Sequence, residues 1–264
     1  MGQNSPAQVR GLRGKGALGQ PIVAASRMRF LPALAVVILF QAVTCPAAHA
    51  QSSGSPGPQW EWWPEYDTYV RLNDSVSLML EASRTTDGQS FKSAEIGPTL
   101  YFTLKPILRR KLDSNDPSKR KYLTFGAGYR YIPAVNNPDE NRAELEFTPR
   151  YYFPGRFLLS NRNRFDLREI GGSFSWRYRP RLTLERSCRV LAVSFSPYAQ
   201  GELFYDSRYG IWNKNIWEFG VIFSAGRRLD VKPYYAHSND SRSSISHVNA
   251  AGLTVSLYFR SNKG

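Results

Sequence analysis

Hydrophobic and polar residues alternate along most of the chain. From Phe174 to Leu184 every second residue is apolar, and the residues between them are Ser175, three arginines and Thr183, with Glu185 following. A period of two is the period of a β-strand. One face of this predicted strand is wholly apolar and the other carries three arginines, which suits neither a soluble core nor a solvated surface. A membrane barrel with a charged interior explains both faces.

Similar segments follow one another from Glu65 to Phe259, and each has about the length that a tilted strand needs to cross a bilayer. The pattern is weakest at 161–168, where Asn161 and Asn163 share the predicted face of Phe165. About eleven strands are expected. Two chain ends in the periplasm require an even number. A further strand at 57–63 would supply it, although that segment could instead fold into the lumen.

The connections also alternate in predicted length. Tight turns are expected at 73–74, 154–155 and 227–228, and longer polar loops at 85–92, 132–140, 206–214 and 238–245. Short turns on one side and long loops on the other are typical of outer-membrane barrels. Two connections break the rule, because 106–119 is long and very basic and 187–192 is of middling length. The basic loop could meet anionic lipid headgroups or simply be solvated.

The faces opposite the apolar ones carry both signs of charge. Charges enclosed in a narrow barrel must pair or bear a heavy desolvation cost, so cross-strand ion pairs between sequential neighbours are expected. The structural interpretation, a salt-bridged filling, is favoured over an anion-attracting passage because carboxylates nearly neutralise the arginines. The predicted lumen ladder consists of Arg142, Glu144, Glu146, Arg150, Arg162, Arg164, Asp166, Arg168, Arg177, Arg179, Arg181, Glu185 and Glu202.

The fold class predicted from these patterns is all-β: a single antiparallel up-and-down transmembrane β-barrel of about ten to twelve strands with a charged, salt-bridged lumen. A soluble lipocalin-like barrel or a sandwich is the alternative, because periodicity alone does not say which face is inside. Several tryptophans and tyrosines are expected near the membrane interfaces, namely Trp60, Trp62, Trp63, Trp176, Tyr178, Trp212 and Trp217.

The N-terminal region predicts export. A basic start at Met28, an apolar run from Phe30 to Val43 and a small-residue end before Gln51 are typical of a cleaved signal peptide. The run is too short for a comfortable membrane-spanning helix. We therefore expect a signal peptide at 1–50, with 1–27 as a candidate upstream start extension. A linker at 51–61, an outer-membrane barrel at 62–259 and a tail at 260–264 follow. Cys188 is the only cysteine after residue 50, so no internal disulfide is expected.

The formal net charge of +14 could suit a nucleic-acid binder, but the basic residues are spread along the strands beside carboxylates. No nucleic acid is therefore expected as a partner. The expected partners are outer-membrane lipid, periplasmic chaperones and the barrel-insertion machinery.

Several segments together resemble a known family. The stretches 148–155, 161–168, 176–186 and 202–209, with the last strand, are similar to a bacterial family of outer-membrane β-barrels known as domain of unknown function 2490. The resemblance covers about Trp62 to Phe259. It implies the barrel fold and no activity, ligand or catalytic residues. Family members usually end at a terminal aromatic, whereas here five residues follow Phe259.

Catalytic chemistry has one candidate. His237, Ser238 and Asn239 resemble the run in outer-membrane lipid hydrolases, but in those the serine lies two residues after the histidine. On a strand His237 and Ser238 would point to opposite sides, and only Ser241 could replace the nucleophile, through a loop. A simple histidine at the barrel rim is the favoured interpretation. His237 and His247 lack an evident third ligand, so neither metal nor cofactor is expected.

The function predicted from the sequence is that of a non-enzymatic outer-membrane barrel of uncharacterised role, structural or passing small solutes poorly. The alternatives are a lipid-modifying hydrolase at His237 and Ser241, and a surface receptor acting through the long loops.

Overall fold

The barrel is formed by strands alone. The computed structural model describes residues 59–87, 90–104, 115–116, 119, 121–190 and 193–260. The predicted signal peptide, most of the predicted linker and much of the basic loop lie outside the described residues. Within the described residues, no helix is long and apolar enough to cross a membrane. The strands are β1 (Gln59–Arg71), β2 (Val76–Asp87), β3 (Ser90–Thr103), β4 (Leu123–Ile132), β5 (Glu140–Phe153), β6 (Phe157–Ile170), β7 (Ser173–Arg186), β8 (Cys188–Val190), β9 (Val193–Asp206), β10 (Ile211–Ala225), β11 (Leu229–Asp240) and β12 (His247–Arg260).

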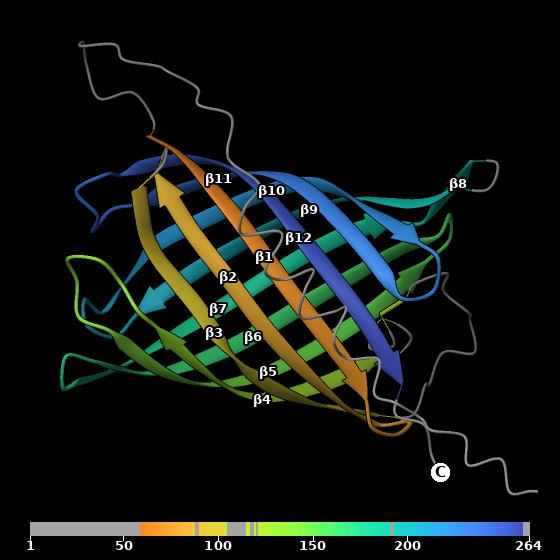
Figure 1. Ribbon diagram of the computed structural model, residues 1–264, viewed down its shortest axis with the longest axis horizontal. Coiled ribbons are helices and arrows are strands. Elements are labelled where there is room, and N and C mark those ends of the chain that lie inside the picture. Colours follow the sequence, from red (N-terminus) through yellow and green to blue (C-terminus); the bar gives the residue numbers. More distant parts are fainter. Residues whose placement is uncertain are drawn as a thin grey trace, which may run out of the picture. The chain divides into compact units, whose positions relative to one another are not determined.

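All of these strands except β8 form a closed ring, so the barrel wall has eleven strands (Figure 1). Neighbours in sequence pair antiparallel, with β7 pairing with β9, and the ring closes where β12 meets β1. That closing pair is parallel. The all-β barrel of ten to twelve strands is thus confirmed, but the expectation of purely antiparallel pairing is wrong, because an odd number of up-and-down strands can close only through one parallel pair.

The expected even strand number is also wrong. Residues 59–63 are not a separate strand but the first part of β1, which therefore begins inside the predicted linker. Gln59 pairs with Val248 near the start of β12, and Arg71 pairs with Arg260 at its end. The first residue of β1 and the last residue of β12 consequently lie at opposite mouths of the barrel.

Strand β8 is the end of β7 rather than an independent element. Glu185 of β7 pairs with Tyr198, and Cys188 of β8 pairs with Phe195. Three residues on the β7–β8 side therefore match three residues on β9. The register with β9 is unchanged across Ser187. The result is a β-hairpin that extends past the neighbouring strands (Figure 1).

The predicted loops are shorter than expected because the strands run further into them. β2 ends at Asp87 and β3 begins at Ser90, and β11 continues to Asp240. One mouth carries residues 133–139, 171–172, 207–210 and 241–246, and the other carries 72–75, 154–156 and 226–228; β3 ends and β4 begins at this second mouth. The longest connection thus lies on the side where short turns were expected.

The two faces of the wall are arranged as the alternation predicts. Trp176 and Leu182 point outward with 40% and 52% of their surface exposed, while Arg179 between them is 8% exposed. The charged face therefore lies inside and the apolar face outside. One aromatic position differs: Trp63 points to the interior, where its Nε1 donates to Glu61 at 2.7 Å.

Two outward asparagines weakened the predicted sixth strand, and the structure shows how they are accommodated. Tyr178 on β7 donates its hydroxyl to Asn163 Oδ1 at 2.6 Å, and the Asn163 amide donates to the carbonyl oxygen of Asn161 at 3.2 Å. Because these polar groups bond to one another, they can remain on an otherwise apolar face.

Inward tyrosines pack over glycines on the next strand. Tyr234 on β11 lies over Gly252 on β12, where a Cβ atom would come within 2.0 Å of its ring. The hydroxyl of Tyr234 donates to the carbonyl oxygen of Trp63 at 3.2 Å. The absence of a side chain at Gly252 therefore allows the ring to lie flat against the wall and to reach across the closing pair β1–β12.

Gly252→Ala should destabilise the barrel by about 1–3 kcal/mol, because Tyr234 must leave its position. Urea unfolding of the detergent-solubilised protein measures this change. Ala251→Leu, which alters the neighbouring outward position, is the control and should leave the midpoint nearly unchanged. Tyr234→Leu should restore much of the stability of Gly252→Ala, and failure of this rescue would contradict the packing argument.

Candidate functional site in the barrel interior

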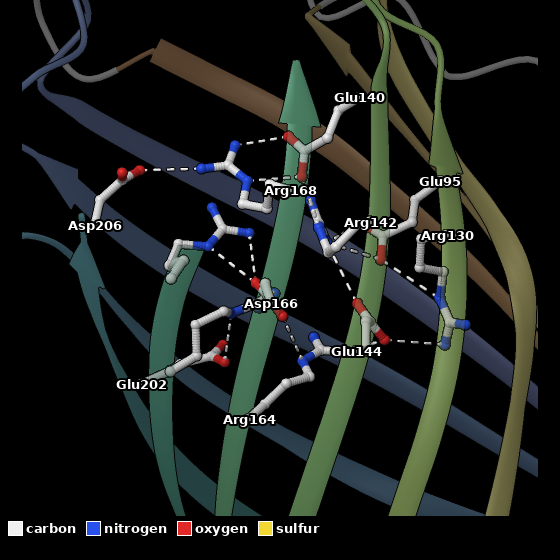
Figure 2. Close-up of polar contacts among 12 residues, drawn as sticks. Glu95, Arg130, Glu140, Arg142, Glu144, Arg164, Asp166, Arg168, Glu202 and Asp206 are labelled. Atoms are coloured by element: carbon white, nitrogen blue, oxygen red, sulfur yellow. Dashed lines mark hydrogen bonds and ion pairs between the residues drawn. The ribbon is translucent and has the colours of Figure 1, made fainter. Parts of the chain in front are cut away.

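Charged side chains from β3 to β9 converge inside the barrel and form one connected network (Figure 2). The strands place them there by simple alternation, since each contributes its inward residues to the same space. Arginines and carboxylates contact one another throughout, and most of these side chains are buried.

Asp166 on β6 is the most enclosed acid of the network, with none of its surface exposed. Arg177 Nη2 lies 2.9 Å from its Oδ2, Arg179 Nη1 lies 3.5 Å from the same atom, and Arg164 Nε lies 3.6 Å from Oδ1. Three guanidinium groups thus surround one carboxylate, which compensates the desolvation of that carboxylate.

Glu202 on β9 is a second centre. It accepts from Arg162 Nη2 at 2.9 Å, from Arg179 Nε at 3.1 Å and from Arg181 Nη2 at 2.7 Å. Arg179 therefore joins the Asp166 and Glu202 centres into one network.

Arg130 on β4 has the inverse arrangement, one buried cation among three acids. Its Nη2 lies 2.8 Å from Glu81 and 3.7 Å from Glu144, and its Nε lies 3.6 Å from Glu95. Glu144 in turn lies 2.9 Å from Arg164 Nη1, which connects Arg130 to the centre at Asp166.

Near the mouth that carries residues 133–139, Arg168 links two acids. Its Nη2 lies 2.6 Å from Glu140 Oε2 and its Nη1 lies 3.0 Å from Asp206 Oδ2. Arg142 also contacts Glu140 at 2.7 Å and Glu95 at 3.3 Å. The part of the network shown in Figure 2 thus extends from Glu95 on β3 to Asp206 on β9, and Glu81 adds β2 through its contact with Arg130.

The register does not place opposite charges directly across from each other. Arg142 faces Arg168, Glu144 faces Asp166 and Arg164 faces Arg179 in the Cα pairing. Most ion pairs therefore run diagonally, or skip a strand, as from Arg142 on β5 to Glu95 on β3. The expectation of ion pairs between sequential neighbours is confirmed, by Asp166 with Arg177 directly across and by Arg164 with Glu144 and Arg168 with Glu140 on the diagonal.

All residues of the predicted ladder lie on inward positions of β5, β6, β7 and β9, but they do not all behave alike. Glu146 accepts from Thr148 Oγ1 at 2.9 Å, and Arg150 donates to Thr124 Oγ1 at 2.7 Å. The ladder omitted Glu140, which was assigned to a loop, and omitted Glu95, Arg130 and Asp206. Extending each alternating segment by one or two residues would have included Glu140.

Glu185 pairs with a residue from the long connection between β3 and β4. Lys119 Nζ lies 2.6 Å from Glu185 Oε2 on β7. Burial by itself would lower the pKa of Lys119, but the Glu185 carboxylate together with Asp116 and Asp230 outweighs burial and raises this pKa above its usual range. Asn115 Nδ2, from the same connection, donates to Asp230 Oδ1 at 2.7 Å. Lys119 is therefore held by the barrel, unlike a solvated or lipid-facing loop residue.

The remaining strands line the interior differently. Tyrosines and single acids prevail on β9 to β12 and β1, where Tyr198 donates to Glu218 and Ser256 Oγ donates to Asp67 Oδ2 at 3.2 Å. Lys232 Nζ lies 3.6 Å from Glu218 Oε1. The interior thus has an arginine-rich sector and a tyrosine-rich sector.

The candidate hydrolase residues do not assemble. His237 lies in β11 and points outward, whereas Ser238 is buried on the inward side. Ser241 donates its hydroxyl to the carbonyl oxygen of Asn213 at 3.2 Å. The ring nitrogens of His237 face the amide oxygens of Asn249 and Asn239, at 2.8 and 3.0 Å. Among the described residues, no three His, Cys, Asp or Glu side chains form a group that could hold a metal ion.

Comparison with known proteins places the chain in a family. A family model described as "Protein of unknown function (DUF2490)" matches residues 60–249. The chain belongs to this family. The match begins in β1 and ends in β12, so it covers nearly the whole DUF2490 barrel, and the resemblance expected from the sequence is confirmed. No curated protein matches the chain significantly.

The interior of this DUF2490 protein is occupied by mutually compensating charges. Each guanidinium of the network, from Arg130 on β4 to Arg181 on β7, already contacts one or more carboxylates, so binding an external anion there would require breaking existing ion pairs. The arrangement resembles a filled core built from ions rather than an open polar passage.

Asp166→Asn should destabilise the protein by about 3–5 kcal/mol, because it leaves three buried guanidinium groups without their common partner. Asp74→Asn is the matched control. Its carboxylate pairs with Arg71 at 2.5 Å but is 82% exposed, and the expected change is within about 0.5 kcal/mol. Urea unfolding in detergent compares the two variants, and equal midpoints would show that the interior network contributes nothing to stability.

Proposed function

We propose that this protein is a non-enzymatic β-barrel of the bacterial outer membrane, exported through a cleaved signal peptide, whose salt-bridged interior makes it structural or poorly conducting. The observation that carries the proposal is the inverted distribution of side chains. Phe174, Leu145 and Phe219 are more than half exposed on the outside, while Arg130 and Asp166 are fully buried inside. An outer wall with this much exposed apolar side-chain surface is favourable in a nonpolar environment such as the hydrocarbon core of a membrane, and unfavourable in water.

The strand lengths support a membrane-spanning wall. Strands β5, β6, β7, β9 and β12 each have fourteen residues, which exceeds the nine to eleven that a tilted strand needs to cross the hydrocarbon core. The closed ring supports it as well, because closure leaves no unpaired sheet edge to face lipid.

Poor conduction follows from the interior contacts. In the arginine-rich sector, ion pairs also join strands that are one strand apart, from β6 to β9 and from β5 to β3, so the inward arginines of this part of the wall are held by carboxylates. A permanently open pore would need an interior that leaves a continuous water path. Lipid, periplasmic chaperones and the barrel-insertion machinery are the partners that this location implies.

Membrane spanning is tested by the positions of the two barrel ends. An epitope inserted before Gln59 and another after Arg260 should be accessible from opposite faces of the outer membrane, because β1 and β12 are parallel. Protease or antibody access in intact and permeabilised cells measures this. Heat-modifiable gel mobility in outer-membrane fractions is the accompanying measurement. Access to both epitopes from the same face, or recovery in the soluble fraction, would refute the proposal.

Conduction is tested in planar bilayers. The wild-type protein should show no resolvable channel, whereas the charge-neutral double variant Arg168→Ser with Glu140→Ser should conduct, because it removes two bulky inward side chains that contact each other on the adjacent strands β6 and β5. Trp217→Leu on the outer surface is the control and should remain closed. A stable wild-type conductance, with no increase in the double variant, would contradict the filled interior.

A further inference from the structure

The outer wall near the mouth that carries residues 241–246 has a polar cluster, which we define as Asn215, His237, Asn239, His247 and Asn249. Register brings it together, since His237 faces Asn249, Asn239 faces His247 and Asn215 faces Asn239 on the adjacent strands. The chain has only two histidines after residue 50, and both belong to this cluster. Their ring centroids lie 6.2 Å apart with 17° between the planes.

Assigning hydrogen-bond donors and acceptors in the cluster shows that several lone pairs point toward the same position, next to Asn239 Oδ1. His237 Nδ1 lies 2.8 Å from Asn249 Oδ1, which also accepts the Tyr235 hydroxyl at 2.7 Å. An amide oxygen has no hydrogen to give, so in a neutral imidazole Nδ1 carries the ring proton and Nε2 keeps a lone pair. That Nε2 lies 3.0 Å from Asn239 Oδ1, another acceptor. Two lone pairs that face each other repel unless a positive charge lies between them.

The second imidazole converges on the same oxygen. His247 Nδ1 lies 2.6 Å from Asn239 Oδ1. Two imidazole nitrogens from adjacent strands and one amide oxygen therefore meet on the outer surface. The sequence did not suggest a third donor because an asparagine two residues after a histidine is not a usual ligand pattern.

We infer that His237 Nε2, His247 Nδ1 and Asn239 Oδ1 bind a divalent first-row transition-metal ion such as Zn²⁺, Ni²⁺ or Cu²⁺. Imidazole suits these ions. The hydrogen bond from His237 Nδ1 to Asn249 is the orienting contact that metal-bound histidines typically make, so Asn249 and Tyr235 are positioning residues. Three protein donors leave a coordination position for water or for an external ligand.

The site is reachable from outside the barrel. His247 is exposed, and the neighbouring outward residues Trp60 and Trp217 are also exposed. The site uses none of the charged residues of the interior network, so it is independent of the poorly conducting lumen.

One competing arrangement uses the same atoms. If the Asn239 amide is turned by 180°, its NH₂ group donates to both rings and the cluster is a closed hydrogen-bond network that needs no metal. Metal binding by the wild-type protein separates the two cases, because the closed network offers no free lone pair to a metal ion, and Asn239→Asp then tests whether the group at position 239 is a ligand. A carboxylate is a stronger metal ligand than an amide oxygen, but it cannot donate to the rings.

The experiment is titration of the purified protein, without a histidine tag and in detergent micelles, with ZnCl₂ by calorimetry and with CuCl₂ by electron paramagnetic resonance. One saturable site with imidazole nitrogen coupling is expected. His237→Ala and His247→Ala should each weaken binding by at least about tenfold, and Asn249→Ala by about tenfold through loss of orientation. Asn239→Asp should strengthen it.

Ser241→Ala is the matched control, because Ser241 lies beside the cluster and its hydroxyl donates to the Asn213 carbonyl oxygen instead of to a cluster residue. The metal affinity of this variant should equal that of the wild type. Heat-modifiable mobility verifies that each variant is folded. The inference is overturned if the wild type shows no saturable binding, as the closed hydrogen-bond network requires, if binding survives loss of both histidines, or if Asn239→Asp weakens it.

Discussion

The structure depends on the free-energy cost of burying charge. A guanidinium or carboxylate group taken out of water loses several kcal/mol of hydration, and it regains this only through well-placed opposite charges. The barrel satisfies the requirement collectively. Asp166 contacts three arginines, Arg130 contacts three acids, and Arg179 is shared between Asp166 and Glu202. No single pair could be removed without leaving its neighbours undercompensated, so the network acts as the core of this protein.

An ionic core changes what specifies the fold. In a soluble protein apolar side chains pack inside and tolerate many exchanges, whereas here each inward position must match the charge of residues on several strands. The shape of the wall is adapted to the filled interior, because inward glycines such as Gly252 leave room for the rings of inward tyrosines. Outside, aromatic pairs such as Trp176 with Tyr205, with ring centroids 5.4 Å apart, pack along the wall. Specificity therefore resides inside, and the exterior supplies nonpolar surface.

The odd strand number has a structural consequence beyond the count. Closure by the parallel pair β1–β12 places the two ends of the barrel wall at opposite mouths, although they lie side by side along the seam. It also aligns Asp67 on β1 with Ser256 on β12 and with Glu81 on β2. The tyrosine-rich sector lies around this seam, while the arginine-rich sector occupies the strands opposite.

The sequence by itself determined the strand alternation, because a period of two follows directly from backbone geometry and needs no partner strand. It also indicated the family, through several matching segments, whereas which face lies inside was shown by the closed barrel. The sequence also identified most members of the interior network. It did not determine which charge pairs with which: Arg142 faces Arg168 in register, and their partners lie diagonally or two strands away. The stagger of the strands and the closure of the barrel decided which charges pair. They also decided that β1 and β12 are parallel and that His237 lies close to His247. These are properties of contacts between distant segments, and local pattern carries no information about their register.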